Sequence, residues 1–218
     1  MEKLQKTIIV LVIVLVLILV STVSLYYYNK SKLTYTYQGK EGDYSFYITK
    51  KGGITTHVVR VFVDGNNEYY YPLRYGPREV ASLDSEGNFK EALFSSEEQG
   101  KFKKILYITQ DPLLGDKTES KSILAVFEIN RITGNNEYGI FKIPTLSAVT
   151  SETERSKELE IPLITCDNVS SSVGVIWLKL GDSNGIYNEN GCIILEGKTG
   201  DDLLMLSDRF VLSLLGVF

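Results

Sequence analysis

The residues Gly181-Asp182-Ser183-Asn184-Gly185 match the pattern G-x-S-x-G. In α/β-hydrolases this pattern places a nucleophilic serine on a sharp turn between a strand and a helix. Here the following residues, 186–195, have strand character and include a second turn at Asn190-Gly191. The hydrolase order also places the histidine after the serine, but the single histidine, His57, comes before it. Gly, Asp, Ser and Asn are preferred turn residues, so we predict a hairpin turn at 181–185 and no nucleophile.

A second glycine-rich stretch, 191–200, is an incomplete match to a phosphate-binding loop. The pattern G-x-x-x-x-G-K-[ST] follows a strand and has four residues between its glycines. Five residues separate Gly191 from Gly197, and these residues read as the strand itself. One histidine and two separated cysteines also cannot supply the usual four ligands of zinc. We therefore predict no cofactor and no metal site.

Carboxylates offer a different chemistry. Asp182 and Glu189 could face each other across a turn, and paired carboxylates at a suitable separation hydrolyse glycosides or hold calcium. Most such side chains are solvated, so a hydrolase of glycans or peptides is the alternative function rather than the main one. His57 shares a strand face with Val59 and Val61, which favours a packed or edge position over catalysis.

Tyrosines point to binding instead of catalysis. The chain contains 14 of them, including the run Tyr69-Tyr70-Tyr71. Tyrosine supplies rigid, amphipathic contact area that suits interfaces with proteins or sugars. We treat Tyr69, Tyr70 and Tyr71 as candidates for a surface that binds an envelope protein or a glycan. The alternative is that alternate tyrosines occupy the half-exposed face of an antiparallel sheet.

Two cysteines, Cys166 and Cys192, each adjoin an apolar segment that could pair with the other's. A disulfide between them would stabilise the fold by roughly 3 kcal/mol through loop closure, and it would indicate an oxidising compartment. The alternative is a pair of buried free thiols. Asn29 and Asn168 lie in N-x-[ST] triplets and are candidate glycosylation sites.

The N-terminal region differs from the rest of the chain. After a short tail (1–6), residues 7–28 carry no charge, and 8–20 are aliphatic throughout. A bilayer-spanning helix needs roughly 20 predominantly apolar residues, and tyrosines at 26–28 suit the aromatic belt at the headgroups. We predict a transmembrane anchor at 7–28 in contact with the lipid bilayer. The alternative, a cleaved signal peptide, has only a poor cleavage site at 21–24.

Orientation does not follow from the flanking charges, because Lys3 and Lys6 precede the apolar run and Lys30 and Lys32 follow it. Long domains translocate largely regardless of charge, and the cysteine pair favours an extracytoplasmic domain. The net charge of −4 with no basic cluster argues against nucleic-acid binding.

The remaining sequence predicts an α+β fold with two lobes. In the first lobe (33–147), β-branched and aromatic segments between 33 and 75 form an antiparallel meander of about four strands, with turns at Gly52-Gly53 and 64–67. A strand (103–109), a helix (118–134) and a strand (138–144) then make a parallel, right-handed βαβ unit.

A polar linker or loop follows the first lobe at 148–160. The second, smaller lobe, 161–218, is of the α/β type and contains both cysteines. A largely apolar helix at 201–215 is too short to span a membrane, so we expect it to pack on the sheet.

The chain contains, in this order, the segments EYYYPLRYGPREV, LYITQDPLLGDKTESKSILAVFEINRITG, GIFKIPT, ITCDN, VIWLKLG, NGCIILEGKTGDDLL and SDRFVLSLLGV. This order resembles that of uncharacterised single-span membrane proteins of archaea with a two-cysteine C-terminal module. The likeness covers about residues 57–218. It implies membrane anchoring, and it brings no activity or site residue with it.

Together these features predict a single-pass membrane protein with an extracytoplasmic domain. Its expected role is non-catalytic binding or assembly at the cell envelope.

Overall fold

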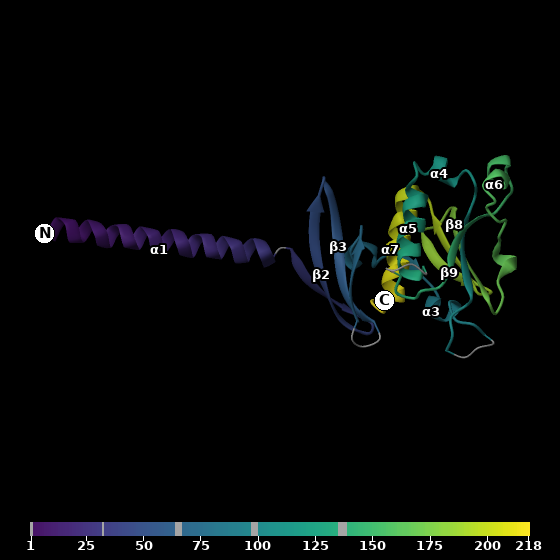
Figure 1. Cartoon of the computed structure of the whole chain (residues 1–218), viewed down its shortest axis with the longest axis horizontal. Helices are drawn as coiled ribbons and strands as arrows, with labels where there is room; N and C mark the ends of the chain where they lie inside the picture. Colours follow the sequence, from purple (N-terminus) through teal and green to yellow (C-terminus); the bar gives the residue numbers. More distant parts are fainter. Residues whose placement is uncertain (1, 32, 64–66, 97–99, 135–138) are drawn as a thin grey trace.

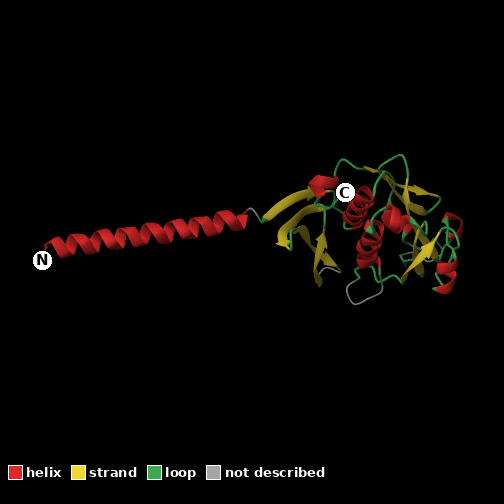
Figure 2. Cartoon of the chain, turned by 90° about the horizontal axis from the view of Figure 1, so that it is seen from above, coloured by secondary structure: helices red, strands yellow, loops and turns green. Residues whose placement is uncertain are grey.

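The computed structural model describes residues 2–31, 33–63, 67–96, 100–134 and 139–218. A long N-terminal helix projects from a layered domain (Figure 1). The domain consists of an antiparallel sheet next to this helix, a layer of helices, and a larger mixed sheet on the far side (Figure 2). The predicted α+β class, the antiparallel meander and the C-terminal helix are confirmed.

The N-terminal helix, α1 (Glu2–Ser31), is a single element of 30 residues. Every side chain from Leu11 to Val20 is at least 47% exposed, and Tyr26 and Tyr27 are 63% and 64% exposed. Among the residues that the structure describes, no helix combines the length and the apolar character needed to cross a bilayer. The prediction of a helix at 7–28 is therefore confirmed, whereas the prediction that it spans a membrane is not.

The antiparallel sheet consists of β1 (Thr34–Gly39), β2 (Gly42–Lys51), β3 (Ile54–Val63) and β4 (Asn67–Leu73), in that order. Its inner face is buried, with Phe46 and Val59 fully inaccessible to solvent. The expected β2–β3 turn is present, and Gly52 and Gly53 adopt φ values of +59° and +80°, which glycine tolerates best. Most of the expected β3–β4 turn, 64–66, lies outside the described residues.

The middle layer contains α5 (Lys121–Thr133) and α7 (Gly200–Leu214), which pack against each other. Thr199 caps α7, because its side chain accepts from the backbone N–H of Asp202 while the Asp202 carboxylate accepts from the N–H of Thr199. Leu203, Leu206 and Phe210 are fully buried. This burial explains the nearly all-round apolar character of α7, which lies between the two sheets (Figure 2).

The mixed sheet has six strands in the order β5-β9-β10-β8-β6-β7. Their bounds are Asp84–Ser85 (β5), Ile105–Gln110 (β6), Thr145–Val149 (β7), Val173–Leu180 (β8), Gly185–Glu189 (β9) and Cys192–Gly197 (β10). Only the β9–β10 pair is antiparallel; the pairs β5–β9, β10–β8, β8–β6 and β6–β7 are parallel.

The βαβ unit forms with one displacement. β6, α5 and β7 follow the predicted order, and β6 and β7 are parallel. However, the described part of the predicted strand 138–144 is irregular, and β7 begins only at Thr145. The backbone N–H groups of Ile140 and Phe141 donate to the carbonyl of Ile132, and that of Ile143 donates to Thr133. These apolar residues therefore close the C-terminal end of α5, where free carbonyls need donors.

The predicted linker at 148–160 does not separate two sheets. Its first two residues, Ala148 and Val149, are the buried end of β7, and β6, β7 and β8 to β10 on its two sides share one sheet. It contains a short helix, α6 (Glu154–Glu158), capped by Thr153. The other short helices are α2 (Pro77–Val80), α3 (Phe89–Ala92), α4 (Leu114–Lys117) and the 3-10 turn η1 (Cys166–Asn168).

Candidate functional site

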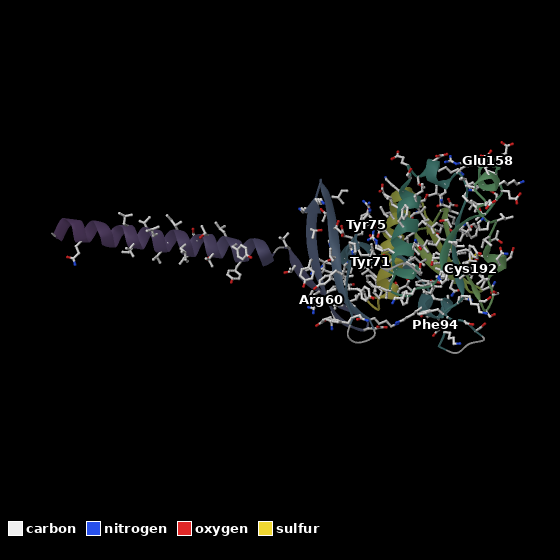
Figure 3. The ribbon with its side chains drawn as sticks, viewed as in Figure 1. Arg60, Tyr71, Tyr75, Phe94, Glu158 and Cys192 are labelled. Atoms are coloured by element: carbon white, nitrogen blue, oxygen red, sulfur yellow. A yellow bond between two sulfur atoms is a disulfide. The ribbon has the colours of Figure 1, made fainter. Side chains whose placement is uncertain are left out.

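The two cysteines form a disulfide, as predicted. Cys166 in η1 and Cys192 at the start of β10 are bonded across 26 residues of sequence, with Cα atoms 5.3 Å apart. Cys192, labelled in Figure 3, is fully buried in a small cluster with Val175 and Ile194. Ile164 and Val169 pack on this cluster, so the bond holds the segment before β8 on the face of the mixed sheet opposite α7.

The G-D-S-N-G segment connects β8 to β9. These strands do not pair with each other, because β10 lies between them, so the prediction of a hairpin turn is wrong. The hydroxyl of Ser183 donates to Oε1 of Glu196 at 2.8 Å, and its backbone N–H donates to the same atom at 3.1 Å. A Cβ on Gly181 would lie 2.2 Å from that oxygen. The glycine and the serine are therefore explained by the approach of a carboxylate.

Glu196 is the centre of a polar cluster that was not anticipated from the sequence. Its Oε2 accepts from the Tyr187 hydroxyl and pairs with Nζ of Lys179, both at 2.7 Å. The hydrogen bond from Lys179 is the main reason that the pKa of Glu196 falls to about 2. Lys179 also lies 5.2 Å from the ring centroid of Trp177. A carboxylate held ionised in this way is unsuited to act as a general acid.

His57 belongs to a chain of polar contacts between three elements. Its Nδ1 lies 2.9 Å from the Tyr35 hydroxyl on β1, and its Nε2 lies 3.1 Å from Oε2 of Glu79 on α2. Burial lowers the pKa of His57, and it raises the pKa of Tyr35 to about 12. Tyr35 is therefore a poor nucleophile at neutral pH. A Cβ on Gly76 would lie 2.6 Å from the Tyr35 hydroxyl and 2.7 Å from Nδ1 of His57, so these residues are tightly packed.

Asp182 and Glu189, the carboxylate pair suggested by the sequence, do not come together. Asp182 precedes the first residue of β9, and Glu189 is its last residue, so the strand itself separates them. A strand of this length holds its ends about 13 Å apart. Both side chains are exposed. Among the described residues, no group of three or more His, Cys, Asp or Glu side chains could hold a metal ion.

Two other carboxyl groups, Asp208 and Glu128, influence each other electrostatically between the antiparallel sheet and the helices. Asp208 on α7 is fully buried, and its Oδ2 accepts from the backbone N–H groups of Arg74 and Tyr75 at 2.9 and 2.8 Å. Glu128 on α5 lies 3.2 Å from Arg131 and 3.9 Å from Arg74. Burial raises the pKa of both carboxyl groups. The contacts of Asp208 fasten the end of β4 to α7.

The three consecutive tyrosines do not share a face. Strand alternation turns Tyr70 outward, where it is 56% exposed, and turns Tyr71 inward, where it is 3% exposed. The Tyr71 hydroxyl donates to the backbone carbonyl of Glu128, and Tyr69 is half-buried. Tyr71 therefore belongs to the core, which corrects its assignment to a binding surface, and only Tyr70 is fully available.

The outward side of the antiparallel sheet is exposed and carries aromatic side chains. Tyr70 lies beside Tyr47, with ring centroids 6.3 Å apart, and Phe62 is 59% exposed. Arg60 pairs with Glu68 and lies 4.9 Å from the Phe62 centroid. Figure 3 shows Arg60 on the side nearest α1, whereas Tyr71 lies on the side of the helices. We call Tyr47, Arg60, Phe62 and Tyr70 the outer aromatic face.

The two candidate glycosylation sites, Asn168 and Asn29, lie in different elements of the fold. Asn168 is exposed at the end of η1. Its side-chain oxygen accepts from the N–H of Thr165 at 2.8 Å, which leaves the amide nitrogen available for modification. Asn29 lies in the last turn of α1, and its side chain is outside the described set.

Comparison of the chain with protein-family models, with curated proteins and with solved structures gives no significant match. The similarity to archaeal single-span proteins therefore stays a prediction.

Proposed function

We propose that the protein is anchored by α1 in a membrane and presents an extracytoplasmic domain with a non-catalytic binding or assembly role at the cell envelope. The observation that carries this proposal is the exposed apolar surface of α1. The ten consecutive aliphatic residues from Leu11 to Val20 project away from the domain (Figure 1). Apolar patches of this size on soluble monomers are rare and mark interaction or membrane surfaces.

Two further features support the proposal. The disulfide fits an oxidising compartment, since structural disulfides are uncommon in reducing cytosol. The two exposed tyrosines at the end of the apolar run, Tyr26 and Tyr27, suit the polar boundary of a bilayer. The outer aromatic face adjoins α1 and is our candidate for contact with an envelope protein or a glycan.

Membrane insertion is tested with the full chain and a charged variant. Leu15→Arg with Leu17→Arg places two charges in the apolar run, at a cost of about 3 kcal/mol each at a bilayer centre. We expect the wild-type chain to stay in the membrane pellet after alkaline carbonate extraction and the variant to enter the supernatant. The control is Leu159→Arg, a comparably exposed position in the domain (59%). Extraction of the wild-type chain would contradict insertion.

The binding role is tested at the outer aromatic face. Phe62→Ser and Leu159→Ser change residues of equal exposure, 59% each, on the antiparallel sheet and at the end of α6. We expect the full chain in detergent to co-sediment with purified cell-wall fragments, and Phe62→Ser but not Leu159→Ser to weaken this. Equal effects of the two substitutions, or none, would reject this face as the binding surface.

One observation favours the alternative, a membrane-tethered hydrolase that uses carboxylates. Glu128, with its raised pKa, lines a cavity of about 300 Å³ together with Arg74 and Arg131. A carboxyl group with a raised pKa at a cavity wall is a candidate general acid. We prefer the binding role because Asp208, the nearby carboxylate, is fully buried and engaged by backbone N–H groups. Glycoside or peptide hydrolysis that is abolished by Glu128→Gln would reverse this preference.

A further inference from the structure

A second cavity lies at the C-terminal end of α7 and is independent of the membrane proposal. It has a volume of about 450 Å³, and its walls come from the β1–β2 turn, the segment 85–90 and the last turns of α7 with the residues that follow. Cavities of this size hold small molecules. Its charged lining residues are Lys40, Glu41, Lys90 and Arg209, and we call it the Arg209 cavity.

Arg209 is in an unusual electrostatic position. Its guanidinium carbon lies 3.4 Å from the ring centroid of Phe218, and the side chain is half-buried. Its Nε and Nη1 are buried and find no hydrogen-bond acceptor among the described residues. Burial lowers its pKa, and the only charged or titratable group that opposes this effect is Tyr37. By contrast, Arg60 and Arg131 each pair with a carboxylate.

The rest of the cavity does not supply the missing negative charge. Lys40 and Lys90 are exposed, and neither forms an ion pair among the described residues. Three cations and the single carboxylate of Glu41 leave two positive charges on the walls. Burying a charge without a partner is unfavourable. Nε and Nη1 of Arg209 are closed to solvent and the guanidinium lies over Phe218, so an anion in the cavity would not reach these two atoms, but it would offset the excess positive charge on the walls.

We propose that the Arg209 cavity binds a small molecule through a phosphate or carboxylate group, which Arg209, Lys40 and Lys90 hold. Arginine carries a permanent positive charge, and lysine adds mobile positive charge. Asn88 and Ser213 also line the cavity and carry donors for further oxygens. Phe89 and Phe218 line its apolar side, so the ligand includes an apolar or planar part.

The test is a titration of the full chain in detergent with inorganic phosphate and, separately, with citrate, at constant ionic strength, by calorimetry. We expect saturable binding of at least one anion. Tighter binding of phosphate would indicate a phosphate ligand, and tighter binding of citrate would indicate a carboxylate ligand. Arg209→Met keeps an apolar stem on Phe218 but removes the charge. It should weaken binding by about tenfold, the loss of one charge-assisted hydrogen bond.

Two further variants keep the test decisive. Arg60→Met removes a guanidinium that is paired with Glu68 outside the cavity, and it should leave the dissociation constant unchanged. Lys40→Gln with Lys90→Gln changes only exposed side chains, so it serves if Arg209→Met does not fold, and it should also weaken binding. Absence of saturable binding by both anions, or equal affinity in the wild-type chain and the lysine double variant, would overturn the proposal.

Discussion

The two sheets of the domain are built in opposite ways. The mixed sheet is covered on one face by α7 and on the other by the segment that the disulfide holds in place, and Cys192 to Leu195 of β10 are all buried. In the antiparallel sheet, β3 alternates, with Val59 and Val61 buried and Arg60 and Phe62 exposed. Sheets that are buried on both faces read as continuous apolar runs, whereas half-solvated sheets alternate.

The two sheets differ in the surface that they leave open to solvent. The central strands of the mixed sheet are covered on both faces and carry the fold, although Leu146 on the edge strand β7 is 51% exposed. The antiparallel sheet keeps one face against α5 and α7 and leaves the outer aromatic face in solvent next to α1 (Figure 1). Substitutions should therefore change stability in the mixed sheet and binding on the outer face of the antiparallel sheet.

The largest expected effect tests this contrast directly. Leu195 on β10 is fully buried, so Leu195→Ala should lower the free energy of unfolding by about 3 kcal/mol through lost burial and a new cavity. Phe62→Ala on the outer aromatic face should change it by less than about 0.5 kcal/mol. Chemical denaturation of the full chain in detergent measures both. Similar losses would show that the outer face is also structural.

Loss of the disulfide should have an effect of similar size. Replacing both Cys166 and Cys192 with serine opens a loop of 26 residues, which should cost about 3.5 kcal/mol in the chain-entropy model. Denaturation with and without reductant gives the same comparison on the wild-type chain. Unchanged stability after reduction would mean that packing alone holds the segment before β8.

The link between the antiparallel sheet and α7 should show an intermediate effect. Asp208→Ala leaves the partly buried N–H groups of Arg74 and Tyr75 without their acceptor, which should cost about 2 kcal/mol. Asp208→Asn keeps a side-chain oxygen as acceptor and removes a buried ionisable group whose pKa is raised. It should therefore lower the free energy of unfolding by less than Asp208→Ala at neutral pH. Greater damage from asparagine than from alanine would contradict this account of the site.

The smallest expected effect is on the pH dependence of stability. Glu196 has a pKa of about 2 in the folded protein against an ordinary value of 4.5. Its contribution to stability is therefore complete above pH 4.5 and is lost as the pH falls towards 2. Glu196→Gln should flatten the dependence of the melting temperature on pH in this window. Glu189→Gln, an exposed position, should not. Equal pH profiles for the wild-type chain and Glu196→Gln would refute the assignment.

Local patterns predicted much of the fold, because the signals were themselves local. Alternation in β3 and the paired glycines at 52 and 53 indicated the meander, and the apolar run in α7 indicated a helix packed on a sheet. The predicted strand at 138–144 failed because its apolar residues cap α5. A short apolar run does not reveal whether it pairs in a sheet or closes a helix.

The polar sites were less accessible to prediction because they depend on strand order. Ser183 and Glu196 meet only because β10 lies between β8 and β9, and nothing in the G-D-S-N-G pattern encodes that order. The same holds for His57 with Glu79 and for Asp208 with the end of β4, which come from distant parts of the chain. Strand alternation did indicate that the three tyrosines could not share a face, because Tyr70 must point away from the side of Tyr69 and Tyr71.

The central claim is a bilayer anchor with the disulfide-bonded domain outside the cytoplasm. Its most direct test is labelling of intact cells by a membrane-impermeant maleimide, with Cys166 as the more exposed thiol of the pair. We predict labelling only after an impermeant reductant is added, without cell lysis. Labelling that needs no reductant and occurs only after lysis would contradict both the disulfide and the extracytoplasmic position.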